Sequence, residues 1–360
     1  MINVTKTFLP PFDEYTAILK RAWDKGWITN NGSLLLELEN KLKEYLRVNH
    51  LLFCSNGTIV LQMAIKALDI TKEIITTPFS YVATTNAILW EGCTPVFVDI
   101  EKNNLCIDTY KIEDAITENT EAILATHVYG FPCSIEKIRK IADKYNLKVI
   151  YDGAHSFGGI YKNKSLLSYG DISTCSFHAT KLFHTVEGGC VISHDEKIAK
   201  KLFLYRSFGH IEDEHISIGI NAKNSELHAA MGLTVLPRIS DIIERRKMLS
   251  NLYLNMLRNH IQIPDFKLDD FQYNYSYFPV IFNSEKTLLK VKKILLENEI
   301  NARRYFYPSL NLVPQIHNTM RCPVSEDISL RVLCLPLYYE LEESDIKRIC
   351  KIILDVLCQG

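Results

Sequence analysis

One lysine of this chain stands in a segment suited to covalent chemistry. Lys181 lies in DISTCSFHATKLFHTVEGG, where an apolar strand is expected to end between Ser176 and His178 and a loop of small and hydroxyl residues follows. A lysine amine in such a pocket can form a Schiff base with a carbonyl compound if its surroundings lower its pKa. Most lysines are solvated surface charges, so Lys181 taken alone leaves that alternative open.

An acidic side chain ends another expected strand. Asp152 follows the apolar run of LKVIYDGAHSFGG, and small residues come directly after it. Ligands of open α/β sheets gather at the carboxyl ends of the strands, so an acid there is well placed for a cofactor. Its carboxylate could keep a pyridine nitrogen protonated and turn the ring into an electron sink. The alternative is an aspartate that caps the next turn.

The segment HLLFCSNGT combines a strand, a turn of small residues and the beginning of a helix near Ile59. A helix N-terminus presents free backbone N–H groups and a partial positive charge to an anion. Gly57 would let the backbone approach a phosphate, and Thr58 could add a hydroxyl donor. A plain helix cap is the alternative interpretation.

The order of the three segments along the chain supports their interpretation as one site. The segment HLLFCSNGT, which could bind a phosphate, comes first. An acid at a strand end follows and, 29 residues after Asp152, a lysine that follows another strand. A type I pyridoxal-phosphate (PLP) fold requires this order. The combination therefore predicts a PLP site in which Lys181 and Asp152 act on the cofactor.

These residues need a parallel sheet to bring them together. From about residue 49 to 193 the chain alternates short β-branched runs with amphipathic helical stretches such as LQMAIKALDI, which predicts an α/β domain. Seven runs predict the strands of one large, mostly parallel sheet. They are residues 49–54, 73–78, 94–100, 122–130, 147–153, 173–178 and 188–194. Most of these runs lack strict alternation of apolar and polar residues, because helices would cover both faces of the sheet.

The length of 360 residues favours two domains. After about Ile239 the sequence changes to a charged helix, short strands and two further helices. We therefore expect a large cofactor-binding domain over residues 1–240 and a smaller carboxy-terminal α/β domain over residues 241–360.

Composition excludes several classes of partner. The 41 basic and 42 acidic side chains nearly cancel and form no blocks, so neither a nucleic acid nor a membrane is expected as partner. The N-terminus lacks the pattern of a signal peptide, and no apolar run is long enough to span a membrane, which predicts a cytoplasmic protein. The histidines show no metal-ligand spacing and the ten cysteines no paired spacing, so we expect neither a metal nor disulfides.

Several motifs together carry a family resemblance over almost the whole chain. They are GWITNNG, SNGT, TPFSYVATTNAI, HVYGFPCSIEKI, YDGAHSFGG, SFHATKLFHTVEGG, GINAKNSELHAAMG and LCLPLYYELEESDI. With these motifs the sequence resembles the DegT-type aminotransferases, which modify nucleotide-linked hexoses. Some relatives carry histidine in place of the lysine and act as dehydratases, so Lys181 argues for amino transfer.

The resemblance assigns cofactor contacts to individual positions. It implies that Lys181 bonds to the cofactor, that Asp152 pairs with the pyridine nitrogen and that Ser176 binds the phosphate. Gly57 and Thr58 would supply phosphate amides.

Three further roles follow from the same resemblance. Tyr81 would stack on one face of the ring, His155 would contact the side of the ring oxygen, and Asn221 would reach the phosphate of a neighbouring subunit, which implies a homodimer with shared active sites. The alternatives are a core tyrosine, a satisfied buried histidine and an ordinary turn residue.

The implied reaction moves an amino group from L-glutamate to a nucleotide-linked keto sugar, with one lysine as anchor and proton carrier. HisAlaThr before Lys181 resembles the 4-keto branch of the family, which points to dTDP-4-dehydro-6-deoxyglucose as acceptor, dTDP-4-amino-4,6-dideoxyglucose as product and O-antigen or a similar glycan as destination. Arg303, Tyr305 and Tyr307 could bind the nucleotide or its diphosphate, or could be exposed residues of a strand-to-loop element.

Other hypotheses stay open at this point. A 3-keto or UDP-linked sugar aminotransferase of the same fold is the nearest one. A regulator that binds a nucleotide sugar without catalysis would belong to a different class, but it predicts loss of the cofactor residues, and Lys181 and Asp152 are both present.

Overall fold

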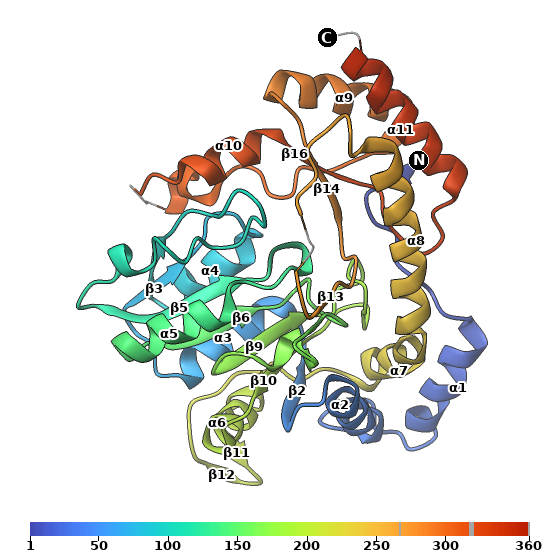
Figure 1. Cartoon of the computed structure of the whole chain (residues 1–360). Coiled ribbons are helices and arrows are strands. Elements are labelled where there is room, and N and C mark those ends of the chain that lie inside the picture. The colour runs from blue at the N-terminus through green and yellow to red at the C-terminus, as the bar shows by residue number, and fades with distance from the viewer. Residues whose placement is uncertain (266–267, 317–319, 359–360) are drawn as a thin grey trace.

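The computed structural model describes residues 1–265, 268–316 and 320–358. A central sheet carries helices on both sides, and a second group of helices and strands packs beside it (Figure 1). This architecture confirms the predicted α/β fold with a mostly parallel sheet.

All seven predicted strands form, and they make one sheet in the order β2-β10-β9-β6-β5-β3-β4. Strand β10 is antiparallel to both neighbours, whereas the other pairs are parallel. The strands are β2 His50–Cys54, β3 Glu73–Thr76, β4 Thr94–Phe97, β5 Thr120–Thr126, β6 Lys148–Asp152, β9 Ile172–Ser176 and β10 Gly189–Ser193.

Eleven α-helices are found in the described residues. They are α1 Phe12–Trp23, α2 Ser33–Leu46, α3 Gly57–Ala67, α4 Val82–Trp90, α5 Ile135–Tyr145, α6 Glu196–Arg206, α7 Glu226–Val235, α8 Ile239–Leu257, α9 Glu285–Glu297, α10 Pro323–Arg331 and α11 Glu343–Cys358. No helix in this part of the chain is long and apolar enough to cross a membrane.

The helices that follow β2 and β5 form because their apolar residues recur at helical spacing and their terminal residues favour a helix end. In α5 the buried residues Ile135, Ile138 and Ala142 repeat at three- and four-residue spacing and face the sheet core, and Asn146 ends the helix in the left-handed conformation. In α3 the apolar side chains from Val60 to Ala67 are buried on more than one face, because the helix lies in the core cluster with strands β2 and β3. Both helices thereby place the carboxyl ends of the preceding strands at one edge of the sheet.

Helices and strands of the carboxy-terminal part form an apolar core of their own. Helices α8, α9 and α11 pack around β14 Phe278–Ile281 and β16 Val332–Leu335, which pair antiparallel. The N-terminus lies beside these elements (Figure 1), where β1 Ile2–Asn3 pairs in parallel with β15 Ile300–Asn301. The division into domains 1–240 and 241–360 stays a prediction, and the chain's first strand joins the carboxy-terminal group.

Short strand pairs complete the structure. They are β7 Ile160–Tyr161 between β8 Lys164–Ser165 and β13 Phe271–Gln272, and the hairpin of β11 His210–Ile211 and β12 Glu214–His215. The hairpin projects away from the sheet beside α6 (Figure 1) and is flanked by exposed apolar side chains, among them Ile216 and Ile218.

Candidate active site

The register of the parallel strands lines up polar side chains at one edge of the sheet. Thr126 at the end of β5 pairs with Asp152 on β6, and Asp152 pairs with Thr174 on β9. Two residues further along β9, Ser176 pairs with Gly189 of β10, which in turn pairs with Cys54 of β2. The carboxyl ends of four sequence-distant segments therefore meet in one place, as the sequence predicted.

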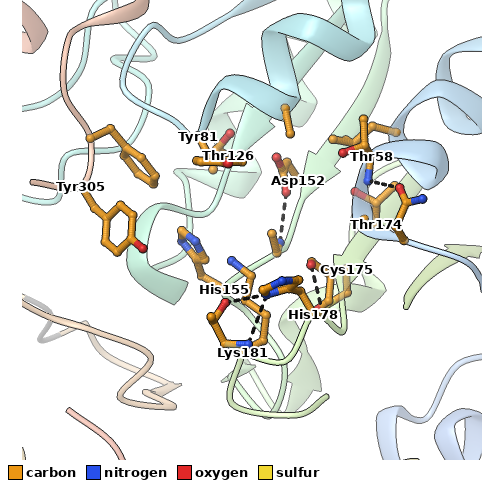
Figure 2. A pocket seen from close by; sticks show the side chains of 18 of the residues that line it. Thr58, Tyr81, Thr126, Asp152, His155, Thr174, Cys175, His178, Lys181 and Tyr305 are labelled. Atoms are coloured by element: carbon orange, nitrogen blue, oxygen red, sulfur yellow. Dashed lines mark hydrogen bonds between the residues drawn. The ribbon is translucent and has the colours of Figure 1, made fainter. Parts of the chain in front are cut away.

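A cavity of about 280 Å³ opens at this edge (Figure 2). Nine of the eleven residues that the sequence singled out line it: Gly57, Thr58, Tyr81, Asp152, His155, Ser176, Lys181, Arg303 and Tyr305. Figure 2 shows Tyr305 on the opposite side of the cavity from Thr58, with Asp152 between them. The cavity is therefore bounded both by the sheet edge and by the carboxy-terminal part of the chain.

Two of the predicted residues lie elsewhere. Tyr307 lines a neighbouring pocket instead of this cavity. The Asn221 side chain accepts a hydrogen bond from Lys223 at 3.0 Å, and the Asn221 backbone bridges to Ser207. Because its predicted role is in the site of a second subunit, a single chain does not test it.

The carboxylate of Asp152 is buried and held at both oxygens. Oδ2 accepts a hydrogen bond from the Thr84 hydroxyl at 2.7 Å, and Oδ1 accepts one from the Ala154 backbone N–H at 3.0 Å. Two donors of the protein therefore hold this carboxylate in one orientation. Asp152 is thus arranged as a fixed acceptor on the cavity wall.

Lys181 lies in the tight turn that follows β9. Its backbone N–H donates to the carbonyl of His178 at 2.8 Å, which fixes the start of the loop. Burial lowers the pKa of the Lys181 amine below its ordinary value, and the negative charge of Asp152 opposes this shift. An amine with a lowered pKa is more often neutral, which is the form that attacks a carbonyl and accepts a proton.

Gly57 approaches Ser176 more closely than any other residue type could. A Cβ atom on Gly57 would stand 2.7 Å from Ser176 Cβ and 3.0 Å from Ser176 Oγ. The Asn56 side chain caps α3 by accepting the N–H groups of Thr58 and Ile59 at 3.0 and 2.8 Å. The Thr58 amide is therefore already used, which differs from the expected amide contact and leaves the Gly57 N–H and the two hydroxyls for an anion.

His155 is buried and its ring is fixed by a neighbouring backbone group. The N–H of Tyr129, whose φ of 54° is left-handed, donates to His155 Nδ1 at 3.2 Å. Burial and the nearby Lys181 hold the pKa of His155 well below its ordinary value, so the ring is neutral with its proton on Nε2. In the described residues Nε2 has no hydrogen-bond partner, so His155 is not the fully satisfied core histidine of the alternative interpretation.

Tyr81 is not a core residue either, because 59% of its surface is exposed. It stands at the N-terminus of α4 and lines the cavity from the side of the sheet edge (Figure 2). Its place fits the expected stacking role, which stays a prediction.

The structure adds residues that the sequence did not single out. Tyr277 and Phe306 line the cavity from the carboxy-terminal part, and Thr126 and Thr174 line it from the strand ends. Thr126 Oγ1 is buried without a hydrogen-bond partner in the described residues. The strand-end position of Thr126 and the position of Phe306 between Tyr305 and Tyr307 were usable signals, whereas the sequence around Tyr277 carries no motif that points to the cavity.

The profile of the DegT/DnrJ/EryC1/StrS aminotransferase family matches residues 13–354. The chain is 40% identical over 363 residues to dTDP-4-amino-4,6-dideoxy-D-glucose transaminase of Escherichia coli, with 98% of each chain covered. It is 32% identical over 335 residues to GDP-perosamine synthase of Escherichia coli O157:H7, with 92% of each covered. A crystal structure of DesI in the presence of its TDP-sugar product is similar with a TM-score of 0.93 at 30% identity, covering 99% of this chain and 93% of that one.

Fold and site thus define an enzyme of the PLP-dependent sugar aminotransferase type. The chain belongs to the DegT/DnrJ/EryC1/StrS aminotransferase family, as the sequence motifs indicated. Family membership implies PLP as cofactor, and the residues present fit this group. Gly57 and Ser176 form a cradle for the phosphate, and a Cβ at Gly57 would fill the space between them. Asp152 is a buried acceptor, and Lys181 is the amine that lines the cavity. In the described residues no three His, Cys, Asp or Glu side chains gather in a way that could hold a metal ion.

Proposed function

We propose that this enzyme transfers the amino group of L-glutamate to carbon 4 of dTDP-4-dehydro-6-deoxy-D-glucose, giving dTDP-4-amino-4,6-dideoxyglucose for O-antigen or another surface glycan in the cytoplasm. The observation that carries the substrate is the 40% identity, over 98% of both chains, to the E. coli enzyme named for this product. The cavity supports the proposed amino transfer, because it brings together an amine, a buried carboxylate and a cradle for an anion.

The positions of the side chains support the cofactor contacts that the family resemblance implies. Lys181 Nζ would bond to the PLP aldehyde, Asp152 would accept the proton of the ring nitrogen, and Ser176 with Gly57 would hold the phosphate. Tyr81 would lie against the ring, and His155 Nε2 would donate to its oxygen substituent. PLP bound there supplies an electron sink that stabilises negative charge next to the amino group during transfer.

The chain's own groups move the protons. Lys181 is the amine that lines the cavity in the described residues. The amino group of glutamate would displace Lys181 from the cofactor, and the freed Nζ would then take the proton from the α-carbon of glutamate and later return a proton to the sugar carbon. The lowered pKa of Lys181 keeps a larger fraction of this amine free to act as base. The aromatic wall of Tyr277, Tyr305 and Phe306 restricts water in the cavity while this occurs.

We further propose a homodimer in which Asn221 completes the partner's phosphate site. The exposed apolar side chains around Asn221 support this proposal, because Phe208, Ile216, Ile218 and Ile220 would be covered by a second subunit. A measured monomer with full activity would contradict it.

The test is amino transfer by the PLP-loaded enzyme with L-glutamate and a series of keto-sugar nucleotides. The acceptors are dTDP-4-dehydro-6-deoxyglucose, its 3-keto isomer, and GDP- and UDP-linked 4-keto sugars, with 2-oxoglutarate as one readout and product NMR as the other. We expect the first acceptor to give the highest kcat/KM and an amine on carbon 4. Amination on carbon 3, or preference for another nucleotide, would replace the proposed substrate by that one. Failure with all acceptors would favour the non-catalytic regulator.

A further inference from the structure

The loop that carries His155 is held by a distant part of the chain. His155 lines the cavity (Figure 2), and its backbone carbonyl accepts hydrogen bonds from the side chains of Asn274, at 2.7 Å, and Ser276, at 2.5 Å. Asn274 Nδ2 also donates to the carbonyl of Phe157 at 2.9 Å. Both donors belong to the segment that joins β13 to β14. Three bonds therefore tie the loop after β6 to residues that are 117 to 121 positions away.

The two donors are fixed by their own segment. Asn274 is fully buried, and its Oδ1 accepts the N–H of Ser276 at 3.2 Å, which makes a turn with Tyr275 at a left-handed φ of 55°. The buried guanidinium of Arg246 donates to the carbonyls of Tyr275 at 2.8 Å and Ser276 at 2.5 Å. The Asn274 amide thus donates twice and accepts once, which fixes its orientation.

The turn of Tyr129 and Gly130, which follows β5, packs against the same contacts. A Cβ at Gly130, whose φ of 88° is left-handed, would stand 2.6 Å from Asn274 Oδ1 and 2.6 Å from the His155 carbonyl oxygen. The hydroxyl of Tyr273 donates to the carbonyl of Tyr129 at 2.9 Å. The N–H of Tyr129 donates in turn to His155 Nδ1 at 3.2 Å. His155 is therefore held both at its backbone and at its ring.

These contacts leave Nε2 as the atom of the His155 ring that a ligand in the cavity can use, because it has no hydrogen-bond partner among the described residues. A hydrogen bond weakens steeply when its donor leaves the preferred distance and angle. The bonds from Asn274 and Ser276 therefore determine whether Nε2 stays in place for a cofactor.

We propose that Asn274 and Ser276 are positioning residues of the cofactor site, which act by holding His155. Neither residue lines the cavity. Through them the carboxy-terminal part of the chain sets the place of a donor for the oxygen substituent of the PLP ring. This inference rests on the proposed function, because it assumes the contact between His155 and PLP. Nothing in the sequence singled out either residue.

The test compares Asn274→Ala and Ser276→Ala with Asn311→Ala. Asn311 is another buried asparagine of the carboxy-terminal part, and its side chain also donates two hydrogen bonds. It neither lines the cavity nor bonds to the His155 loop, so it controls for the loss of a buried amide as such. His155→Phe is the reference variant, because it keeps an aromatic ring and removes the ring nitrogens.

Hydrogen exchange at the Tyr129 amide of the apoenzyme tests the positioning without cofactor. This N–H bonds to His155 Nδ1 and not to Asn274, so its exchange rate reports on the place of the ring. We expect Asn274→Ala to raise the rate about tenfold, the factor that the loss of one hydrogen bond implies. Ser276→Ala should raise it less, because two of the three bonds remain, and Asn311→Ala should match the wild type.

An unchanged exchange rate in Asn274→Ala would overturn the proposal, whether or not the enzyme has the proposed function. If Asn274→Ala does not fold, Ser276→Ala decides by the same measurement.

Cofactor binding measures the consequence. Fluorescence titration of the apoenzymes gives the PLP affinity, and a pH titration of the PLP-loaded enzymes gives the pH at which the visible absorption band of bound PLP shifts. We expect Asn274→Ala to weaken PLP binding about tenfold and to move this pH in the same direction as His155→Phe does. Asn311→Ala should change neither quantity.

The double variant decides whether Asn274 acts through His155. Adding Asn274→Ala to His155→Phe should change neither quantity further, because the ring that Asn274 positions is then already without its donor. Fully additive effects would contradict the proposal. If His155→Phe binds PLP as the wild type does, with an unshifted band, the His155 contact of the proposed function fails instead, and the exchange rate at Tyr129 still decides the positioning.

Discussion

Thr84 Oγ1 donates a hydrogen bond to Asp152 Oδ2 at 2.7 Å, although the two residues are 68 positions apart. Both side chains are buried, and Thr84 belongs to α4, whose N-cap residue Tyr81 lines the cavity. A carboxylate that accepts such a bond is held in one orientation. Thr84 is therefore a positioning residue that acts on the cofactor through Asp152.

Replacing Thr84 by Val removes this hydroxyl at nearly constant shape. We expect PLP affinity to fall by about tenfold, because outer partners of ligand groups typically contribute 10- to 100-fold, and Thr84→Ser should restore most of it. Fluorescence titration of the apoenzyme with PLP measures the effect without depending on turnover.

Thr85 provides the matched control. It is the adjacent helix residue and fully buried, but its hydroxyl has no hydrogen-bond partner in the described residues. Thr85→Val should leave PLP affinity unchanged. Equal losses in Thr84→Val and Thr85→Val would show that general packing of α4, and not the bond to Asp152, determines the affinity.

A buried ion pair supports the strand that leads to the phosphate cradle. Arg206 at the end of α6 donates to Glu39 of α2, and both side chains are buried. Glu39 also accepts the N–H of Phe53 at 2.8 Å, and Arg206 donates to the Phe53 carbonyl at 3.1 Å. The pair thus holds β2 directly before the Ser55–Thr58 turn.

Arg206→Met should lower the free energy of unfolding by about 3–5 kcal/mol, because it leaves the Glu39 charge buried without its partner. The double variant Glu39→Met with Arg206→Met should recover a large part of this loss, since no unpaired charge then remains. Urea denaturation of the three apoenzymes measures both effects. If the free energy of unfolding of Arg206→Met lies within about 1 kcal/mol of the wild-type value, water reaches the Glu39 charge and the ion pair does not stabilise the fold as proposed.

His127 makes the stability of the fold depend on pH. Burial lowers the pKa of its imidazole to about 3, while Nδ1 accepts the N–H of Cys133 at 3.1 Å. The unfolded chain binds a proton at this histidine below its ordinary pKa of about 6.5, whereas the folded chain does not. The contribution of His127 is therefore fully present above this pH and is lost as the pH falls toward 3.

We expect His127→Asn, whose side-chain oxygen can replace the Nδ1 acceptor, to reduce this acid sensitivity. Between pH 6 and 4 the slope of the free energy of unfolding against pH should decrease by up to about 1.4 kcal/mol per pH unit. Replacing the exposed His260 by Asn serves as the control and should not change the slope. Urea unfolding at several pH values provides the measurement, and an unaltered slope in His127→Asn would contradict the assignment.

The sequence predicted the parts of the site that depend on single strands. Asp152 and Lys181 each follow an apolar run, and the parallel order of β5, β6 and β9 is enough to bring such residues to one edge. The strand–turn–helix pattern marked the turn at Gly57, whereas Ser176 was assigned from the family resemblance. These features are local in the chain, so a motif can mark them.

Features that depend on packing between distant segments could not be predicted in this way. Thr84 lies in the TPFSYVATTNAI motif, but nothing in this motif singled out Thr84, and its contact with Asp152 exists only after α4 packs on the sheet. Tyr277 and Phe306 reach the cavity because the carboxy-terminal part folds over the sheet edge. The Thr58 N–H can donate either to the Asn56 side chain or to a bound anion. The sequence alone does not decide between these two acceptors.

The central claim is that Lys181 holds PLP and moves the protons. The most direct measurement is borohydride reduction of the PLP-loaded enzyme, followed by mass spectrometry of the peptide that contains Lys181, with Lys181→Arg as the matched variant that keeps the positive charge. We predict that the wild type carries the reduced pyridoxyl group on Lys181 and that Lys181→Arg binds PLP without a reducible bond and transfers no amino group. A pyridoxyl group on another lysine, or amino transfer by Lys181→Arg at the wild-type rate, would contradict the account.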